Sequence, residues 1–68
     1  MAREWMKKKR EEKSMTMKEM AAKLNITEAY YSYIESGARQ KVMDISLAAK
    51  LAEIFSLSIQ QIVELEAE

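Results

Sequence analysis

The 68-residue chain contains no cysteine, no histidine and no proline, and it has a single glycine. Without cysteine it can form neither a disulfide framework nor a thiolate metal site. Without histidine it lacks the commonest general base and the commonest metal ligand. It also has no Gly-rich phosphate loop and no run of about 18 apolar residues that could span a membrane. We therefore expect a protein that is not an enzyme, holds no metal, cofactor or small-molecule ligand, and is not inserted in a membrane.

The length and composition fit one small folded domain over residues 1–68. Hydrophobic residues make up 49% of the chain, which indicates a packed core rather than disorder. The basic N-terminal residues are not followed by an apolar stretch, so we do not expect them to form a signal peptide. A cytoplasmic protein is the expectation.

The formal net charge is zero, but the charges are unevenly distributed. Residues 1–23 carry eight basic and four acidic side chains, and the remainder carries three basic and seven acidic ones. This asymmetry is consistent with one face that meets a polyanion and another that is turned away from it. It is equally consistent with an ordinary helix whose lysine face is solvated.

Residues 16–37 form the most informative stretch, which predicts two short helices joined by a tight turn. Thr16 can cap the first helix, and Glu19 lies three residues later, where it completes a capping box. Asn25 tolerates the left-handed conformation that ends a helix. The apolar residues of this first helix, at helical spacing, are Met20, Ala21 and Leu24.

The second helix of this stretch follows directly after the turn. Ile26 is expected to point back to the core, and Thr27 is a second N-cap. Gly37 is the residue type best suited to end the helix. The apolar face comprises Tyr30, Tyr31 and Ile34.

The flanking segments predict three more helices and no strand. A first helix covers residues 2–13, with Ala2, Trp5 and Met6 on one face, and residues 38–44 form a loop. Asp44 caps a helix over 45–55, and Ser58 with Gln61 forms a capping box before a helix over 59–65. The acidic tail from about residue 64 is expected to fray. The apolar residues of these last two predicted helices are Ile45, Ala48, Leu51, Ala52, Phe55, Ile62, Val63 and Leu65.

The central stretch resembles the helix-turn-helix of the Cro and phage-repressor (XRE-like) family. The matching residues are Thr16, Glu19, Ala21, Leu24, Asn25, Ile26, Thr27, Tyr30, Ile34, Glu35 and Gly37. The resemblance implies an all-α, compact five-helix lambda-repressor-like domain with the motif at helices 2 and 3. It also implies a repressor-like transcriptional regulator that binds double-stranded DNA sequence-specifically as a homodimer. Its recognition helix, residues 27–36, would enter the major groove.

The resemblance assigns site residues at the matching positions. The residues expected to contact bases are Thr27, Glu28, Ala29, Ser32 and Tyr33. The residues expected to contact the DNA backbone are Met17, Lys18, Tyr30, Ser36, Arg39 and Lys41. Arg10 and Glu35 match positions that the family uses for a structural ion pair, and we expect this pair to be buried.

Two positions depart from the family pattern. Met17 stands where the family usually has a Gln that contacts a phosphate, and a methionine can only pack there. The loop over 38–44 lacks the proline that the family often has, so a looser or partly helical connection is expected.

Two alternatives stay open from the sequence. The chain could be a protein-binding module on the same fold, such as an anti-repressor or an antitoxin-like partner, which Met17, Glu28 and the zero net charge favour. Ile59, Ile62 and Val63 could form a contact between protomers, or they could simply close the core.

Overall fold

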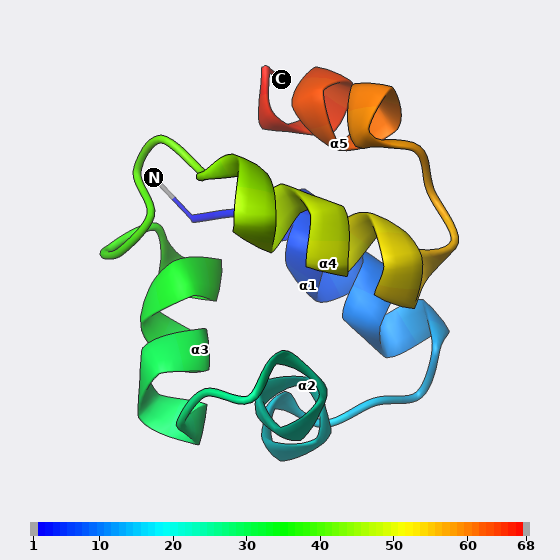
Figure 1. The fold of residues 1–68 in the computed structure, drawn as a ribbon. Coiled ribbons are helices and arrows are strands. Elements are labelled where there is room, and N and C mark those ends of the chain that lie inside the picture. The colour runs from blue at the N-terminus through cyan, green and yellow to red at the C-terminus, as the bar shows by residue number, and fades with distance from the viewer. Residues whose placement is uncertain (1, 68) are drawn as a thin grey trace.

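The chain folds into five helices, and the computed structural model describes residues 2–67. In chain order the helices are α1 (Glu4–Glu12), α2 (Met17–Leu24), α3 (Glu28–Ser36), α4 (Ile45–Phe55) and α5 (Ile59–Glu66) (Figure 1). No strand occurs within the described range. The all-α five-helix fold expected from the sequence is confirmed.

Polar caps fix where four of the helices begin. Thr16, Thr27, Asp44 and Ser58 each accept a hydrogen bond from the backbone N–H three residues later. These bonds satisfy N–H groups that have no partner inside the helix. Both predicted capping boxes are present, at Thr16 and at Ser58.

Left-handed residues end three of the helices. Asn25 follows α2 with φ 58°, Gly37 follows α3 with φ 85°, and Ser56 follows α4 with φ 56°. Asn25 and Gly37 are the two residues that the sequence predicted for this role. The segment between Gly37 and Asp44 is a loop as expected, and it contains none of the helix that the missing proline would have allowed.

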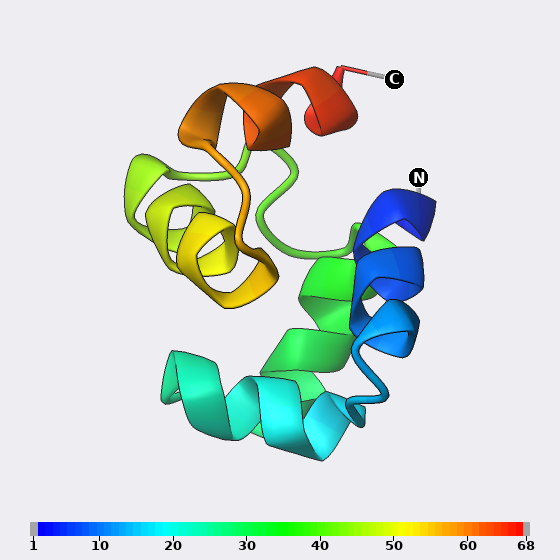
Figure 2. The same cartoon turned by 90° about the vertical axis from the view of Figure 1, so that its right-hand side faces the viewer.

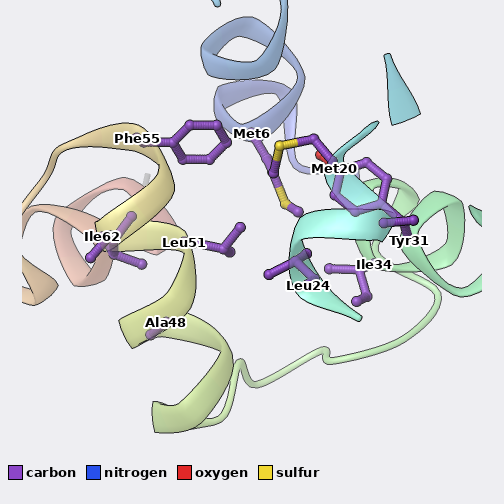
Figure 3. Close-up of a cluster of buried hydrophobic side chains, with 11 residues drawn as sticks. Met6, Met20, Leu24, Tyr31, Ile34, Ala48, Leu51, Phe55 and Ile62 are labelled. Carbon is purple, nitrogen blue, oxygen red and sulfur yellow. The ribbon is translucent and has the colours of Figure 1, made fainter. Parts of the chain in front are cut away.

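One apolar core joins all five helices (Figure 3). Met6 comes from α1, Met20 and Leu24 from α2, Tyr31 and Ile34 from α3, Leu51 and Phe55 from α4, and Ile62 from α5. Trp5 closes one side of the core, with its ring edge-to-face on Phe55 at a centroid distance of 6.4 Å. The core fixes the angle between α2 and α3, because both helices bury one face in it.

Two expectations about the beginnings of helices were wrong. Helix α1 begins at Glu4, so Ala2 lies outside it and is exposed, whereas the neighbouring Arg3 is buried. Ile45, which the sequence placed on the apolar face of its helix, is 70% exposed. Val63, for which the sequence left a core position and a contact between protomers open, is 53% exposed. Apolar periodicity identifies the buried face of a helix, but it does not show how far along the helix its neighbours extend.

The acidic tail also differs from the expectation. Glu64 and Glu66 belong to α5 rather than to a frayed end, and Glu66 is half-buried against α1. Contacts with Arg3 and Trp5 hold it there. Glu68, the last residue of the predicted tail, lies outside the described residues.

We predict that Leu51→Ala destabilises the fold by about 2–5 kcal/mol, because it leaves a cavity among fully buried side chains. Ile45→Ala, in the same helix, should change the free energy of unfolding by less than about 0.5 kcal/mol. Urea unfolding followed by circular dichroism measures both values. Equal losses in the two variants would contradict the described burial.

Candidate nucleic-acid interface

Helix α3 turns one face to the core and the opposite face to solvent. Tyr31 and Ile34 are fully buried on the inner face. Helix α2 lies at one end of the molecule and α5 at the other in both ribbon views (Figure 2). The outer face of α3 carries the five residues that the sequence assigned to base contacts. They are Thr27, Glu28, Ala29 and Tyr33, which are exposed, and Ser32, which is half-buried.

A buried ion pair holds α3 against α1. The Arg10 guanidinium donates from Nε to Glu35 Oε2 at 3.0 Å and from Nη2 to Glu35 Oε1 at 3.1 Å. The Tyr31 hydroxyl donates to Glu35 Oε2 at 2.7 Å, and Arg10 Nη1 donates to the carbonyl of Met15 at 2.9 Å. The Arg10 guanidinium therefore connects α1 with the segment before α2 and, through the Glu35 carboxylate, with α3.

This pair positions α3 more than it adds stability. Both side chains are almost entirely removed from water, so the desolvation penalty offsets much of their attraction. The hydrogen bond to Glu35 raises the pKa of Arg10 above its ordinary value. Burial, followed by the hydrogen bond to Glu35, raises the pKa of Tyr31. Loss of either ionic partner alone should cost about 3–5 kcal/mol, because it leaves an uncompensated buried charge.

The residues assigned to the DNA backbone fall into two groups. Lys18, Ser36, Arg39 and Lys41 are exposed. The Arg39 guanidinium lies 5.8 Å from the centre of the Tyr33 ring, a cation–π distance that keeps the charge beside α3.

Met17 and Tyr30 form the second group, because their side chains are half-buried against the core. The Tyr30 hydroxyl already accepts a hydrogen bond from the Gln40 amide at 3.1 Å. Ser36, although exposed, donates to the carbonyl of Tyr33 in its own helix. These three residues are thus less available to a ligand than the free cations of the first group.

A hollow of about 220 Å³ lies between the beginnings of α1 and α2 and the outer side of α3. Its lining includes Lys7, Met17, Ser32 and Ser36. The first turn of α2 offers free N–H groups and the positive end of the helix dipole to an anion. Lys7 therefore joins the candidate phosphate contacts. The sequence analysis missed it, because only the packing of α1 on the motif places it there.

The surface is less basic than the sequence suggests. Arg10 is paired with Glu35, and Arg3 is paired with Glu66, with its Nε 2.9 Å from Oε2. Both arginines are buried, so two of the eight basic side chains in residues 1–23 cannot face a partner. The family pattern pointed to Arg10, whereas no signal in the sequence marked Arg3 as internal.

Over residues 2–67 the structure shows no grouping of three or more metal-ligating acidic, histidine or cysteine side chains. Within the same range, every helix is too short or too polar to traverse a bilayer.

The chain is similar in sequence to known helix-turn-helix proteins. A family profile described as Helix-turn-helix matches residues 6–62. The chain is 44% identical over 46 residues to YqaF of Bacillus subtilis (strain 168), an uncharacterised HTH-type transcriptional regulator. That alignment covers 68% of this chain but only 60% of the relative. No solved structure shows significant similarity to the chain.

The buried Tyr31 predicts an alkaline loss of stability. Its raised pKa means that the native state keeps the phenolic proton at a pH where the unfolded chain, with a tyrosine pKa of about 10, has lost it. The free energy of unfolding therefore falls above about pH 10, by up to about 1.4 kcal/mol per pH unit from this group. Tyr31→Phe removes this contribution and also the hydrogen bond to Glu35.

Urea titrations at increasing pH test this prediction. The stability advantage of the wild type over Tyr31→Phe should be constant below about pH 9 and shrink above about pH 10. Tyr33→Phe, at a half-exposed ring on the same helix, is the matched control and should follow the wild type. A wild-type advantage that persists unchanged above pH 10 would contradict the argument.

Proposed function

Because the chain belongs to the helix-turn-helix family of Cro and phage-repressor (XRE-like) proteins, we propose that it is a transcriptional regulator that binds double-stranded DNA and catalyses no reaction. This proposal rests on the outer face of α3. Four of its five side chains are exposed and Ser32 is half-buried, while the opposite face and the buried ion pair with α1 fix its direction. Such a helix fits the major groove of B-DNA.

In this proposal the N-terminal half of α3 reads base edges. Thr27 and Ser32 donate to or accept from base edges, Ala29 contacts a thymine methyl, and Glu28 accepts from cytosine N4. Tyr33 lies along the groove wall. This face contains no Arg, Lys, Asn or Gln, so the strongest bidentate contacts to guanine and adenine are missing. We infer modest base discrimination that is supplemented by the shape of the DNA.

Exposed cations around α3 supply the phosphate contacts. Arg39 and Lys41 lie in the loop that follows α3, Lys18 lies in the first turn of α2, and Lys7 lines the hollow beside it. They flank the reading face on more than one side, so phosphates along the groove would be neutralised while α3 is inserted.

The domain is proposed to act as a homodimer in the cytoplasm. A single motif gives little affinity, whereas a two-fold dimer can occupy half-sites about 34 Å apart. Ile59 and Val63 leave exposed apolar surface on α5, and Ile62 between them is buried in the core. The first two are therefore available for a contact between protomers, and Ile62 is not.

A second candidate function is a protein-binding module on the same fold. Three observations favour it. Met17 cannot donate to a phosphate, the exposed Glu28 would repel one, and two arginines form buried ion pairs within the protein. Such a module would bind a regulator rather than a duplex.

Salt dependence distinguishes the two functions. Fluorescence anisotropy with a random-sequence duplex of about 30 base pairs should show binding at about 50 mM salt, and the affinity should fall at least tenfold by about 200 mM, because counterions are released from the phosphates. No detectable binding at the lower salt concentration would reject the DNA reader and favour the protein-binding module.

The proposed register of α3 makes a separate prediction. Selection of bound sites from random duplexes should yield altered base preferences for Thr27→Ala and Ser32→Ala. Arg39→Ala should weaken all sequences alike and reduce the slope of log K against log salt by about one. If both α3 variants select the wild-type site, the assignment of these residues to base edges is wrong.

A further inference from the structure

Arg3 is a buried cation that the helix-turn-helix pattern does not explain. Its side chain is only 7% exposed. Nη1 donates to the carbonyl of Ile34 at 2.6 Å and to the carbonyl of Arg39 at 3.2 Å. Nη2 donates to the carbonyl of Gln40, and Nε donates to the Glu66 carboxylate at 2.9 Å. One guanidinium therefore joins the end of α3, the following loop and α5.

The contact with α3 is chemically favourable. The last carbonyls of a helix have no partner within it and carry the negative end of the helix dipole, so a cation is stabilised there. The Arg3 backbone N–H also donates to the carbonyl of Glu35 at 2.8 Å. A planar guanidinium can satisfy several carbonyls in a fixed geometry, which a lysine cannot do.

The contact with the loop fixes a conformation that is otherwise unfavourable. Gln40 has φ 55°, a left-handed value that costs a non-glycine residue about 1–2 kcal/mol. Arg3 donates to the carbonyl of Gln40. The Gln40 side chain donates to the Tyr30 hydroxyl and accepts from the backbone N–H of Asp44, both at 3.1 Å. The loop is thus anchored on both sides of its most strained residue.

The same anchor determines where Arg39 lies. Its carbonyl is held by Arg3, and its backbone N–H donates to the carbonyl of Tyr33 at 3.1 Å. Its guanidinium is free of ion pairs within the described residues and lies over the Tyr33 ring. An unbroken series of contacts therefore runs from Glu66 in α5, through Arg3, to the cation beside the reading face of α3.

We propose that Arg3 is a positioning residue for DNA binding, which holds the loop after α3 so that Arg39 reaches a phosphate while α3 lies in the groove. The proposal rests on the proposed function. Arg3 touches no DNA itself, because its side chain is buried and four hydrogen bonds hold its guanidinium within the protein. Glu66, which also accepts from the Trp5 indole N–H at 2.8 Å, orients Arg3 from α5.

A purely structural role for Arg3 would lower stability without a specific link to Arg39. A double-mutant cycle separates the two roles, because it isolates the coupling between two residues. The cycle uses the full chain as wild type, Arg3→Gln, Arg39→Ala and the double variant. The probe is the random-sequence duplex of about 30 base pairs at about 50 mM salt, a condition under which phosphate contacts dominate affinity.

Arg3→Gln should weaken duplex binding about tenfold when Arg39 is present and less than about twofold when Arg39 is alanine. Lys8→Gln is the matched control, because it removes an exposed charge from the same end of the chain, and Lys8 has no ion pair with any residue in the range 2–67. Its effect should be the same with and without Arg39. Circular dichroism confirms that each variant is folded at the assay temperature.

Every outcome is informative. If the wild type does not bind the duplex, the proposed DNA-binding function is wrong, and the role of Arg3 in it is overturned as well. If the wild type binds and Arg3→Gln causes the same loss in both backgrounds, the positioning role is overturned although the DNA-binding function stands. If Arg3→Gln does not fold, Arg3→Lys takes its place in the cycle. Failure of both variants to fold would assign Arg3 to stability alone and overturn the proposal.

Discussion

The structure depends on one buried carboxylate. Glu35 lies near the end of α3, accepts two hydrogen bonds from Arg10 and a third from Tyr31, and is 6% exposed. Apolar packing of Tyr31 and Ile34 decides which face of α3 is turned inward, but it is less directional than hydrogen bonds to a charged group. The buried Glu35 carboxylate is stable only while it stays within reach of its donors on Arg10 and Tyr31, so it holds α3 in one position. The direction of the outer face of α3 follows from that restriction.

Local signals made most of the fold predictable. The N-caps and the left-handed residues act within a few positions of the chain, so Thr16, Asn25, Thr27 and Ser58 could be assigned without knowledge of the tertiary structure. The exposure of Ile45 and the burial of Arg3 could not be assigned, because both depend on segments distant in sequence. The contact between Arg3 and Glu66 spans 63 positions, and no periodic pattern reports such a pairing.

The candidate site was predictable to the same extent. The five positions on the outer face of α3 follow from helical geometry once Tyr31 and Ile34 are assigned to the core. Their spatial grouping follows from the fold, whereas their contact with DNA stays a prediction. The hollow that includes Lys7 required the packing of α1 against the motif. A charge count over the sequence also overstated the basic surface, since it cannot separate solvated cations from Arg3 and Arg10.

The placement of Trp5 has a practical consequence. It is the only tryptophan of the chain, and it lies where α1 meets Phe55 of α4 and Glu66 of α5. Its half-buried indole would become solvated if α5 separated from the rest of the protein, even while α2 and α3 stayed together. Intrinsic fluorescence therefore gives this protein an unlabelled optical probe of α5, distinct from the tyrosines of α3.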